Sequence, residues 1–345
     1  MREIKSLCLF FILCATSCLS QQKYYAVTAA FYNFENLFDT ENDPFTFDDD
    51  YTPEGKNYWT LERLSAKQVK LSKVIADLGV EQTSRPPALL GFAEVENRNV
   101  VEQLIDMESL QHIDYGLVHY DSPDKRGIDV GLLYDRDLFH LKNSQTHTLF
   151  LFDEQGKRIF TRDQLCVSGY LADELIYLIV CHWPSRRGGL KRSQSKRMQA
   201  ARLTKHIIDS LSIVTKNPKV ILMGDFNDNP TDASFKEVLH TRTNKVQDSS
   251  YYLYAPMERK FLRGYGSLAY RDQWSLFDQF LVSSPLLFSE GWRYYDAHIF
   301  SEQYLKHQKG KYRGYPKRTF ERGSYVGGYS DHFPVYLTLV KEVME

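Results

Sequence analysis

The chain has 345 residues, of which 43% are hydrophobic and 25% are charged, and its formal net charge at pH 7 is −1. This is the composition of an ordinary globular protein with an ample core. The near-zero charge excludes a general electrostatic attraction to nucleic acid. The length allows either two domains or one large domain built on two sheets.

Residues 1–20 have the layout of a secretory signal, in which basic residues precede an apolar run that is too short to span a bilayer. Cys18 ends a sequence that resembles a bacterial lipobox, although Ala15 replaces the usual leucine. This pattern favours a lipid anchor on Cys18, whereas cleavage after Ser20 would release the chain. We therefore expect an exported protein, which is secreted, periplasmic or lipid-anchored at the cell envelope.

Outside the signal region the chain has two cysteines, Cys166 and Cys181, and each lies inside an apolar run. An exported protein can join them in a disulfide, but two buried free thiols fit their strand-like surroundings at least as well. No cysteine pair has the spacing of zinc ligands.

The charges are segregated along the chain. Residues 39–54 contain seven acids and no base, residues 186–205 contain eight bases and no acid, and residues 306–322 contain seven bases and one acid. Such blocks are often solvated surfaces, but basic blocks that flank a phosphate-binding site would form a funnel for anions. The acidic block predicts a long solvated loop, with a calcium site as the alternative.

The first predicted strand, residues 25–31, ends in a polar segment that contains Asn33 and Glu35. A helix is predicted between Thr60, a suitable N-cap, and Gly79, a suitable terminating residue. Its apolar face is formed by branched aliphatic residues, namely Leu61, Leu64, Leu71, Ile75 and Leu78.

The next predicted strand, residues 88–95, carries Glu94 near its end. An acid among buried apolar residues is costly unless it is paired or holds a metal, so Glu94 is a candidate metal ligand. A helix at 100–110 and strands at 115–120 and 128–134 follow.

The loop between these two strands contains Arg126, which either binds phosphate as a bidentate donor or pairs with a loop acid. Strands at 164–171 and 174–181 are then predicted to form a hairpin. The second strand ends in a polar loop that begins with His182 and leads to a basic helix at 191–211. This loop also contains Trp183, Arg186 and Arg187.

A short apolar strand, residues 220–224, stops abruptly in a polar loop that contains Asp225 and Asn227. Because a sheet holds such a loop rigidly, these two side chains can face one cleft while Phe226 turns towards the core. A short helix near Ser234 follows.

Further strands are predicted at 266–270 and 276–282, and the second carries Asp278 in an apolar setting. Asp331 and His332 precede the closing strand, residues 335–340. They repeat the pattern of polar side chains at a strand end.

Several strand ends therefore deliver side chains of complementary chemistry. Carboxylates can hold a hard divalent cation, amides and imidazoles can steady phosphate oxygens, and an acid or a histidine can activate water. Metal-assisted hydrolysis of a phosphoester needs these groups together. The residues at the strand ends that supply these groups are Asn33, Glu94, His182, Asp225, Asn227, Asp331 and His332.

The ordered motifs resemble the endonuclease/exonuclease/phosphatase superfamily. They are Tyr-Asn-Phe-Glu-Asn at 32–36, Glu94, His-Trp-Pro-Ser at 182–185, Gly-Asp-Phe-Asn at 224–227, Asp278 and Ser-Asp-His-Phe-Pro at 330–334. The resemblance implies an α/β fold, a four-layer α/β/β/α sandwich with two packed mixed sheets. It also implies one domain over residues 21–345, with the site at one edge of the paired sheets.

The resemblance further implies a metal site. Glu94 resembles the principal Mg²⁺ ligand, and Asn33 and Asp331 would lie nearby. Glu35 stands where some members have another acid that binds metal. Mn²⁺ and Ca²⁺ are alternatives to Mg²⁺.

The remaining roles are catalytic. Asp225 resembles the residue that orients or deprotonates the attacking water, and Asn227 resembles one that holds the phosphate. His332 resembles the catalytic histidine and Asp278 its orienting carboxylate, with either Asp225 or His332 as the base. His182 matches the members that have a histidine in contact with phosphate.

We therefore predict an exported or surface-anchored, metal-dependent phosphodiester hydrolase, an endonuclease-type nuclease that uses in-line attack by water. Its partner would be nucleic acid, contacted by Arg126, Trp183, Arg186 and Arg187. One alternative is a phosphodiesterase or phosphatase acting on lipid head groups or inositol phosphates. Another is a non-catalytic binding protein on the same fold, and no obligate protein partner is indicated.

Overall fold

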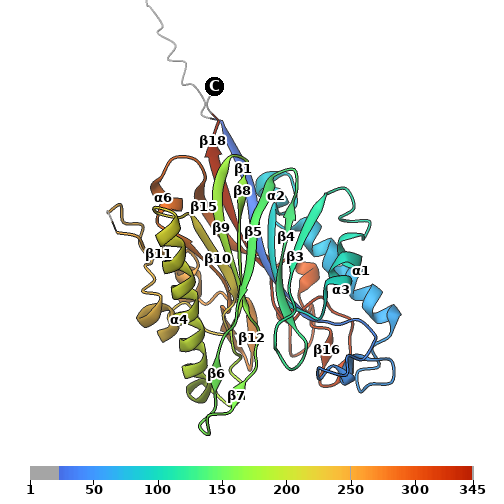
Figure 1. The fold of residues 1–345 in the computed structure, drawn as a ribbon. Helices are drawn as coiled ribbons and strands as arrows, with labels where there is room; N and C mark the ends of the chain where they lie inside the picture. Colours follow the sequence, from blue (N-terminus) through green and yellow to red (C-terminus); the bar gives the residue numbers. More distant parts are fainter. Residues whose placement is uncertain (1–22, 249, 344–345) are drawn as a thin grey trace, which may run out of the picture.

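Two six-stranded mixed sheets lie face to face, with helices on their outer sides (Figure 1). The computed structural model describes residues 23–248 and 250–343. The predicted signal segment, residues 1–20 with Cys18, lies outside the described residues.

The first sheet has the strand order β15-β18-β1-β2-β4-β3. The bounds of its strands are β1 Tyr24–Leu37, β2 Leu89–Val95, β3 Tyr115–His119, β4 Asp129–Asp135, β15 Arg293–Ile299 and β18 Val335–Glu342. Strands β1 and β2 are parallel, and the other pairs in this sheet are antiparallel.

The second sheet has the strand order β11-β14-β10-β9-β8-β5. The bounds of its strands are β5 Phe139–His147, β8 Gln164–Leu171, β9 Glu174–His182, β10 Val220–Asp225, β11 Leu253–Tyr254 and β14 Asp278–Ser283. Strands β9 and β10 are parallel, so each sheet has one parallel pair at its centre.

Helices cover both outer faces (Figure 1). Helices α1 (Leu61–Asp77) and α3 (Arg98–Ile105) cover the first sheet, and α4 (Leu190–Val214) covers the second. Short helical segments are η1 Asp49–Tyr51, α2 Val80–Thr83, η2 Ser234–Val238, α5 Glu258–Leu262, α6 Pro285–Phe288 and η3 Gln303–Leu305. Small hairpins are formed by β6 (Leu151–Phe152) with β7 (Arg158–Ile159), β12 (Leu268–Tyr270) with β13 (Gln273–Ser275), and β16 (Phe320–Glu321) with β17 (Ser324–Tyr325).

Three apolar layers hold these elements together. The central layer joins the inner faces of both sheets, with Phe31 of β1 and Met223 of β10 among its fully buried side chains. A second layer lies between the first sheet and α1 with α3, and a third lies between the second sheet and α4. This arrangement confirms the predicted α/β/β/α layering, which follows from burying one apolar stripe per helix and both faces of each sheet.

Helix α1 begins and ends close to the predicted residues. The Thr60 side chain accepts a hydrogen bond from the backbone N–H of Arg63, and Gly79 has a left-handed φ of 71°. Leu61 was expected on the apolar face, but its side chain is 70% exposed. The helix predicted at 100–110 spans Arg98–Ile105. It begins earlier than predicted because the Asn97 side chain caps it by accepting from the N–H of Val100.

Two remaining findings concern cysteines and membranes. Cys166 and Cys181 are buried free thiols on neighbouring strands, and burial raises the pKa of each to about 12. In the part of the chain that the structure describes, no helix has both the length and the hydropathy needed to cross a bilayer.

Candidate active site

Strand register brings the polar side chains of the second sheet to one edge. His182 ends β9 and Asp225 ends the parallel neighbour β10, and the two residues are paired in register. Asp278 begins the antiparallel strand β14 directly opposite Asp225. Because parallel strands end on the same side and an antiparallel neighbour starts there, three functional groups meet at this edge.

The first sheet supplies the facing half of the site in the same way. Asn33 lies near the end of β1 and Glu94 near the end of its parallel neighbour β2, while His332 lies three residues before the start of β18. The Asn33 Nδ2 donates a hydrogen bond of 3.2 Å to Asp225 Oδ2. This buried contact connects the two sheets at the site.

Three of the site residues have left-handed backbone conformations although they are not glycines. The φ values are 50° for Glu35, 61° for Glu94 and 51° for Asn227. Such conformations are unfavourable for residues with a Cβ and concentrate at functional sites. At Glu94 and at Glu35 they coincide with register shifts at the ends of β2 and β1.

The buried residues His332, Asp278 and Asp225 form the tightest group in the site. His332 Nδ1 lies 2.6 Å from Asp278 Oδ2, and its Nε2 lies 3.9 Å from Asp225 Oδ2. The Ser267 hydroxyl donates to the same oxygen of Asp278 at 2.6 Å. Burial by itself lowers the pKa of His332, but Asp278, and then Asp225 and Asp331, raise that pKa well above the ordinary value.

His182 faces the same centre, but its pKa is shifted in the opposite direction from that of His332. Its Nε2 lies 3.6 Å from Asp225 Oδ2 and 3.7 Å from Glu94 Oε1. Burial, followed by the positive charge of Arg162, holds the pKa of His182 well below the ordinary value. His182 is therefore neutral at pH 7 and can donate one hydrogen bond without carrying a charge.

Asp225 is held by its own loop. Its Oδ1 accepts a 2.9 Å hydrogen bond from the Asn227 N–H, and burial raises its pKa to about 7. The Asn227 side chain donates to the Trp183 carbonyl at 3.1 Å, which ties this loop to the loop after β9.

Arg162 is a site residue that sequence reasoning missed. Its buried guanidinium donates to Asp124 Oδ2 at 3.0 Å and to the Trp183 carbonyl at 2.7 Å. No motif surrounds Arg162, and its relation to the site arises only from tertiary contacts between the segments 121–127 and 182–187.

The predicted metal ligands differ in how far they are already engaged. Glu35 Oε2 accepts two hydrogen bonds from Thr319 and lies 3.9 Å from the buried Lys67 ammonium. Asp331 Oδ2 accepts a 2.6 Å hydrogen bond from Arg318.

Glu94 is engaged more weakly, because its Oε2 accepts from the Asn36 N–H at 3.1 Å while its Oε1 faces His182. It therefore keeps the most capacity for a metal among these acids.

The donor chemistry of this region fits a hard divalent cation. Burial, followed by the negative charges of Glu35, Glu94 and Asp331, raises the pKa of the Tyr51 hydroxyl, so these three carboxylates all act electrostatically on one group. Lys67 lies within ion-pair distance of Glu35 and Arg318 pairs with Asp331, so two cations face three carboxylates. Carboxylate and amide oxygens in excess of local cations are the ligands that Mg²⁺ and Ca²⁺ take.

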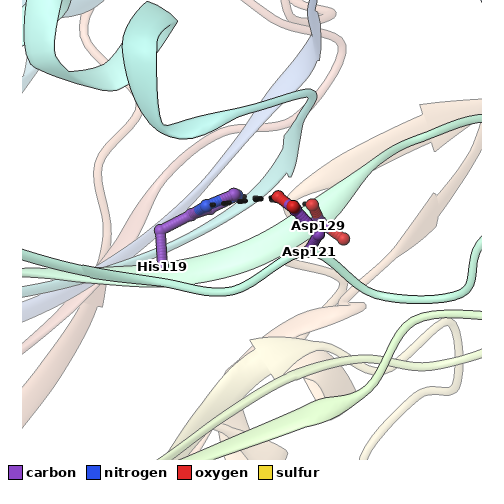
Figure 2. Close-up of side chains that lie close together, drawn as sticks. All are labelled: His119, Asp121 and Asp129. Carbon is purple, nitrogen blue, oxygen red and sulfur yellow. Dashed lines mark ion pairs between the residues drawn. The ribbon is translucent and has the colours of Figure 1, made fainter. Parts of the chain in front are cut away.

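Two groups of potential metal-binding side chains have ligand atoms within 4.8 Å of one another in residues 23–248 and 250–343. One is Asp225, Asp278 and His332, and the other is His119, Asp121 and Asp129. In the second group the Nδ1 of His119 faces Asp121 at 4.0 Å and the Nε2 faces Asp129 at 3.4 Å (Figure 2). The two nitrogens thus face different carboxylates, one in the loop that carries Arg126 and one at the start of β4.

The four predicted substrate-binding residues are placed very differently. Arg126 has a side chain that is 44% exposed and lies 3.5 Å from Asp124, and Arg187 is exposed. Arg186 donates to the Asn227 carbonyl at 2.8 Å and to Asp232 at 2.6 Å, so much of its hydrogen-bonding capacity holds the Asp225 loop.

The prediction that Trp183 contacts the substrate is wrong, because it requires an exposed ring. Trp183 is 1% exposed, and its ring packs against Phe226 and Phe235 at centroid distances of 4.8 Å and 5.6 Å. Its ring is part of the core beneath the site and cannot stack on a substrate.

Solved structures with the same fold cover nearly the whole chain. Truncated TDP2 from Caenorhabditis elegans is 13% identical with a TM-score of 0.53, over 91% of this chain and 98% of that chain. TDP2 from D. rerio complexed with a single-strand DNA product is 12% identical with a TM-score of 0.53, over 91% and 98%. A mannosyl-6-phosphatase from Bacteroides thetaiotaomicron is 17% identical with a TM-score of 0.50, over 92% and 100%. Identities this low show the shared fold alone, and no curated protein matches the chain in sequence.

The fold and the convergent acids and histidines define the class of a phosphoester hydrolase. Residues 28–341 match the family model described as the Endonuclease/Exonuclease/phosphatase family, and the chain belongs to this family. This confirms the resemblance drawn from the sequence motifs. The family consists of enzymes that hydrolyse phosphoester bonds, and acidic groups that can bind a metal are present in the described residues.

Proposed function

We propose that the protein is an exported, Mg²⁺-dependent phosphodiesterase that cleaves nucleic acid. The observation that carries this proposal is the placement of His332 between Asp278, at 2.6 Å, and Asp225, at 3.9 Å. A histidine oriented by one carboxylate and aimed at a second is an arrangement for moving a proton during the attack of water.

The pKa shifts of His332 and Asp225 suggest a different role in proton transfer for each side chain. The carboxylates around His332 keep its imidazole protonated at pH 7, so this side chain can stabilise or protonate a phosphate oxygen. Asp225, with a pKa of about 7, can accept a proton from the attacking water. This assigns the role of base to Asp225, a choice that the sequence leaves open.

His182 and Asn227 are the proposed phosphate ligands. Neutral His182 can donate to a phosphate oxygen, and Asn227 lies on the rigid loop that also holds Asp225. Preorganised donors of this kind stabilise the negative charge that develops in the transition state.

Glu94, Asn33 and Asp331 would hold the metal ion, with Glu35 as a further carboxylate nearby. Mg²⁺ is the proposed ion, and Mn²⁺ or Ca²⁺ are alternatives. When bound, such a cation supplies polarisation of a phosphate oxygen and stabilisation of the leaving oxygen.

A second candidate is the hydrolysis of a phosphomonoester or of a phosphate on an inositol or lipid head group. The fold shared with a mannosyl-6-phosphatase favours this candidate. The fold shared with TDP2 in complex with single-strand DNA favours nucleic acid.

Export, with or without a lipid anchor on Cys18, remains the proposed localisation.

A substrate panel tests the proposed function. The chain from residue 21 onwards is incubated with plasmid DNA, RNA, a chromogenic phosphodiester and mannose 6-phosphate, with Mg²⁺ and with a chelator. We expect Mg²⁺-dependent cleavage of a nucleic acid and of the small diester. Release of phosphate from the sugar phosphate alone would replace nucleic acid by the second candidate.

A further inference from the structure

A pocket of about 330 Å³ lies beside the catalytic centre, in the size range of small-molecule sites. Asp331 forms part of its wall, and Asp331 Oδ1 lies 3.8 Å from His332 Nε2. The rest of the wall comes from the β12–β13 hairpin and from the segment between β15 and β18. A substrate held at His332 can therefore extend directly into this pocket.

Aromatic rings continue from the catalytic histidine to the pocket wall. Phe333, the residue after His332, stacks on Trp274 with a centroid distance of 5.9 Å. Trp274 contacts Tyr315 at 5.8 Å, and Tyr315 contacts Tyr312 at 5.7 Å. The wall rings Tyr312 and Tyr315 are thus connected through Trp274 to the residue that follows His332.

Tyr270 adds an exposed ring at the rim of the same pocket. It lies at the turn of the β12–β13 hairpin, and 67% of its surface is exposed. The Arg271 guanidinium lies 5.2 Å from its ring centroid. A large aromatic side chain left in solvent next to a catalytic centre is available to a ligand.

The charges of the pocket favour an anion. Its three acids are already engaged: Asp272 with the Tyr315 hydroxyl, Glu321 with His307 and Asp331 with Arg318. By contrast, among the residues that the structure describes, no carboxylate lies within ion-pair distance of Arg271, Lys311 or Arg322. With Arg318, the wall holds four arginine and lysine side chains against three acids, so positive charge is in excess.

Ring faces combined with unpaired cations suit a planar base that is joined to phosphates. A sugar phosphate would also satisfy the cations and can pack a C–H face on a tyrosine, but a planar base presents its whole π-face to the ring and gains stacking energy. Resting on the proposed function, we propose that this pocket binds a nucleobase of the substrate next to the scissile phosphate. Tyr270 and Tyr312 stack on the base, while Arg271, Lys311 and Arg322 face the neighbouring phosphates.

Binding of two oligomers that differ only in their bases tests this proposal. Fluorescence anisotropy measures the affinity of an oligothymidine and of an abasic oligomer with the same length and charge, in chelator to prevent cleavage. We expect the wild-type protein to bind the oligothymidine roughly tenfold more tightly, because a base stacked on an aromatic ring adds binding energy. Tyr270→Ala should reduce this preference, because only Tyr312 is left to stack on the base, without weakening binding of the abasic oligomer.

Tyr295→Ala is the matched control, since Tyr295 is also 67% exposed but lies on β15 and outside the pocket. It should keep the full preference. Equal wild-type affinity for the two oligomers, or an undiminished preference in Tyr270→Ala, overturns the proposal. Competition by mannose 6-phosphate as strong as that by thymidine monophosphate would do so too, and would assign the pocket to a sugar.

Failure here is distinguishable from failure of the proposed function. Hydrolysis of the chromogenic diester reports on the catalytic centre and needs no base in the pocket. Hydrolysis without base preference would refute only the pocket assignment, whereas base preference without hydrolysis would refute only the catalytic one.

Discussion

At the scale of single residues, one hydrogen bond sets the charge of the catalytic histidine. Asp278 is fully buried and contacts His332 Nδ1 at 2.6 Å, so it fixes both the orientation and the protonation of the imidazole. Ser267 is a second polar partner, since its hydroxyl donates to Asp278 Oδ2 and accepts from the Asp278 backbone N–H. Asp278 is therefore a positioning residue that acts through His332.

Asp278→Asn should lower kcat by on the order of 10²–10⁴-fold and leave KM nearly unchanged, because the amide keeps the shape but loses the charge that holds His332 protonated. Steady-state kinetics on the chromogenic diester measures the effect. The pKa of His332, followed by NMR titration, should fall. Asp296→Asn is a matched control, since Asp296 lies 3.2 Å from His298 on a surface strand. Wild-type kcat in Asp278→Asn would contradict the assigned role.

The sequence indicated the residues that end strands, and it did so for a physical reason. His182, Asp225 and Asp278 lie where apolar runs meet polar segments, and strand register then brings them together. Arg162 and Lys67 follow no such rule, since their positions depend on which distant segments fold over them. Trp183 was misplaced because its sequence context does not distinguish a ring above the strand end from one beneath it.

At the scale of elements, a buried ion pair fastens α1 to the site. The Lys67 ammonium donates to the Thr319 hydroxyl at 2.6 Å and lies 3.9 Å from Glu35. Burial, followed by the charge of Asp331, raises the pKa of Glu35 to about 7. The contact therefore joins α1, the end of β1 and the segment that leads to Asp331.

Lys67→Ala should destabilise the fold by about 3–5 kcal/mol, because removing one partner of a buried pair leaves the other charge uncompensated. Urea denaturation monitored by circular dichroism measures the loss. Lys205→Ala removes an exposed lysine paired with Asp209 in α4 and should cost less than about 1 kcal/mol. Equal stability of the two variants would show that the Lys67 contact does not support the fold.

Sequence reasoning did not find the edge strands β5 and β15, although it found the edge strand β3. Strand β5 exposes most of its side chains, and β15 mixes exposed and half-buried ones, so neither shows a clear apolar alternation. Each lies at the edge of its sheet and is defined by pairing with β8 or β18. Central strands such as β10 are buried on both faces, and their continuous apolar runs made them predictable.

At the scale of the whole molecule, the basic block at 186–205 is only partly free. Arg197 is fully buried against Asp228, and Arg186 pairs with Asp232. Lys191 and Arg192 are exposed at the start of α4, which follows directly from the His182 loop. This block therefore contributes fewer free cations to the predicted anion funnel than its sequence suggests, and Lys191 and Arg192 are two that remain exposed.

Lys191→Ala combined with Arg192→Ala should flatten the salt dependence of single-strand binding. Each lost phosphate contact reduces the slope of log K against log salt by about 0.7, so we expect a change of about 1.4. The control variant combines Lys205→Ala and Lys216→Ala and should leave the slope unchanged. Lys205 lies farther along α4, and Lys216 lies just after its end. An unaltered slope in the first variant would place the nucleic acid away from α4.

The central claim is that His332 and its two carboxylates perform phosphoester hydrolysis, and His332→Ala tests it most directly. The measurement is Mg²⁺-dependent hydrolysis of the chromogenic phosphodiester by wild type and variant, with thermal denaturation to show that both are folded. We predict a wild-type rate that chelator abolishes and a loss in the variant of on the order of 10²–10⁴-fold. A folded variant that hydrolyses the diester at the wild-type rate would contradict the account.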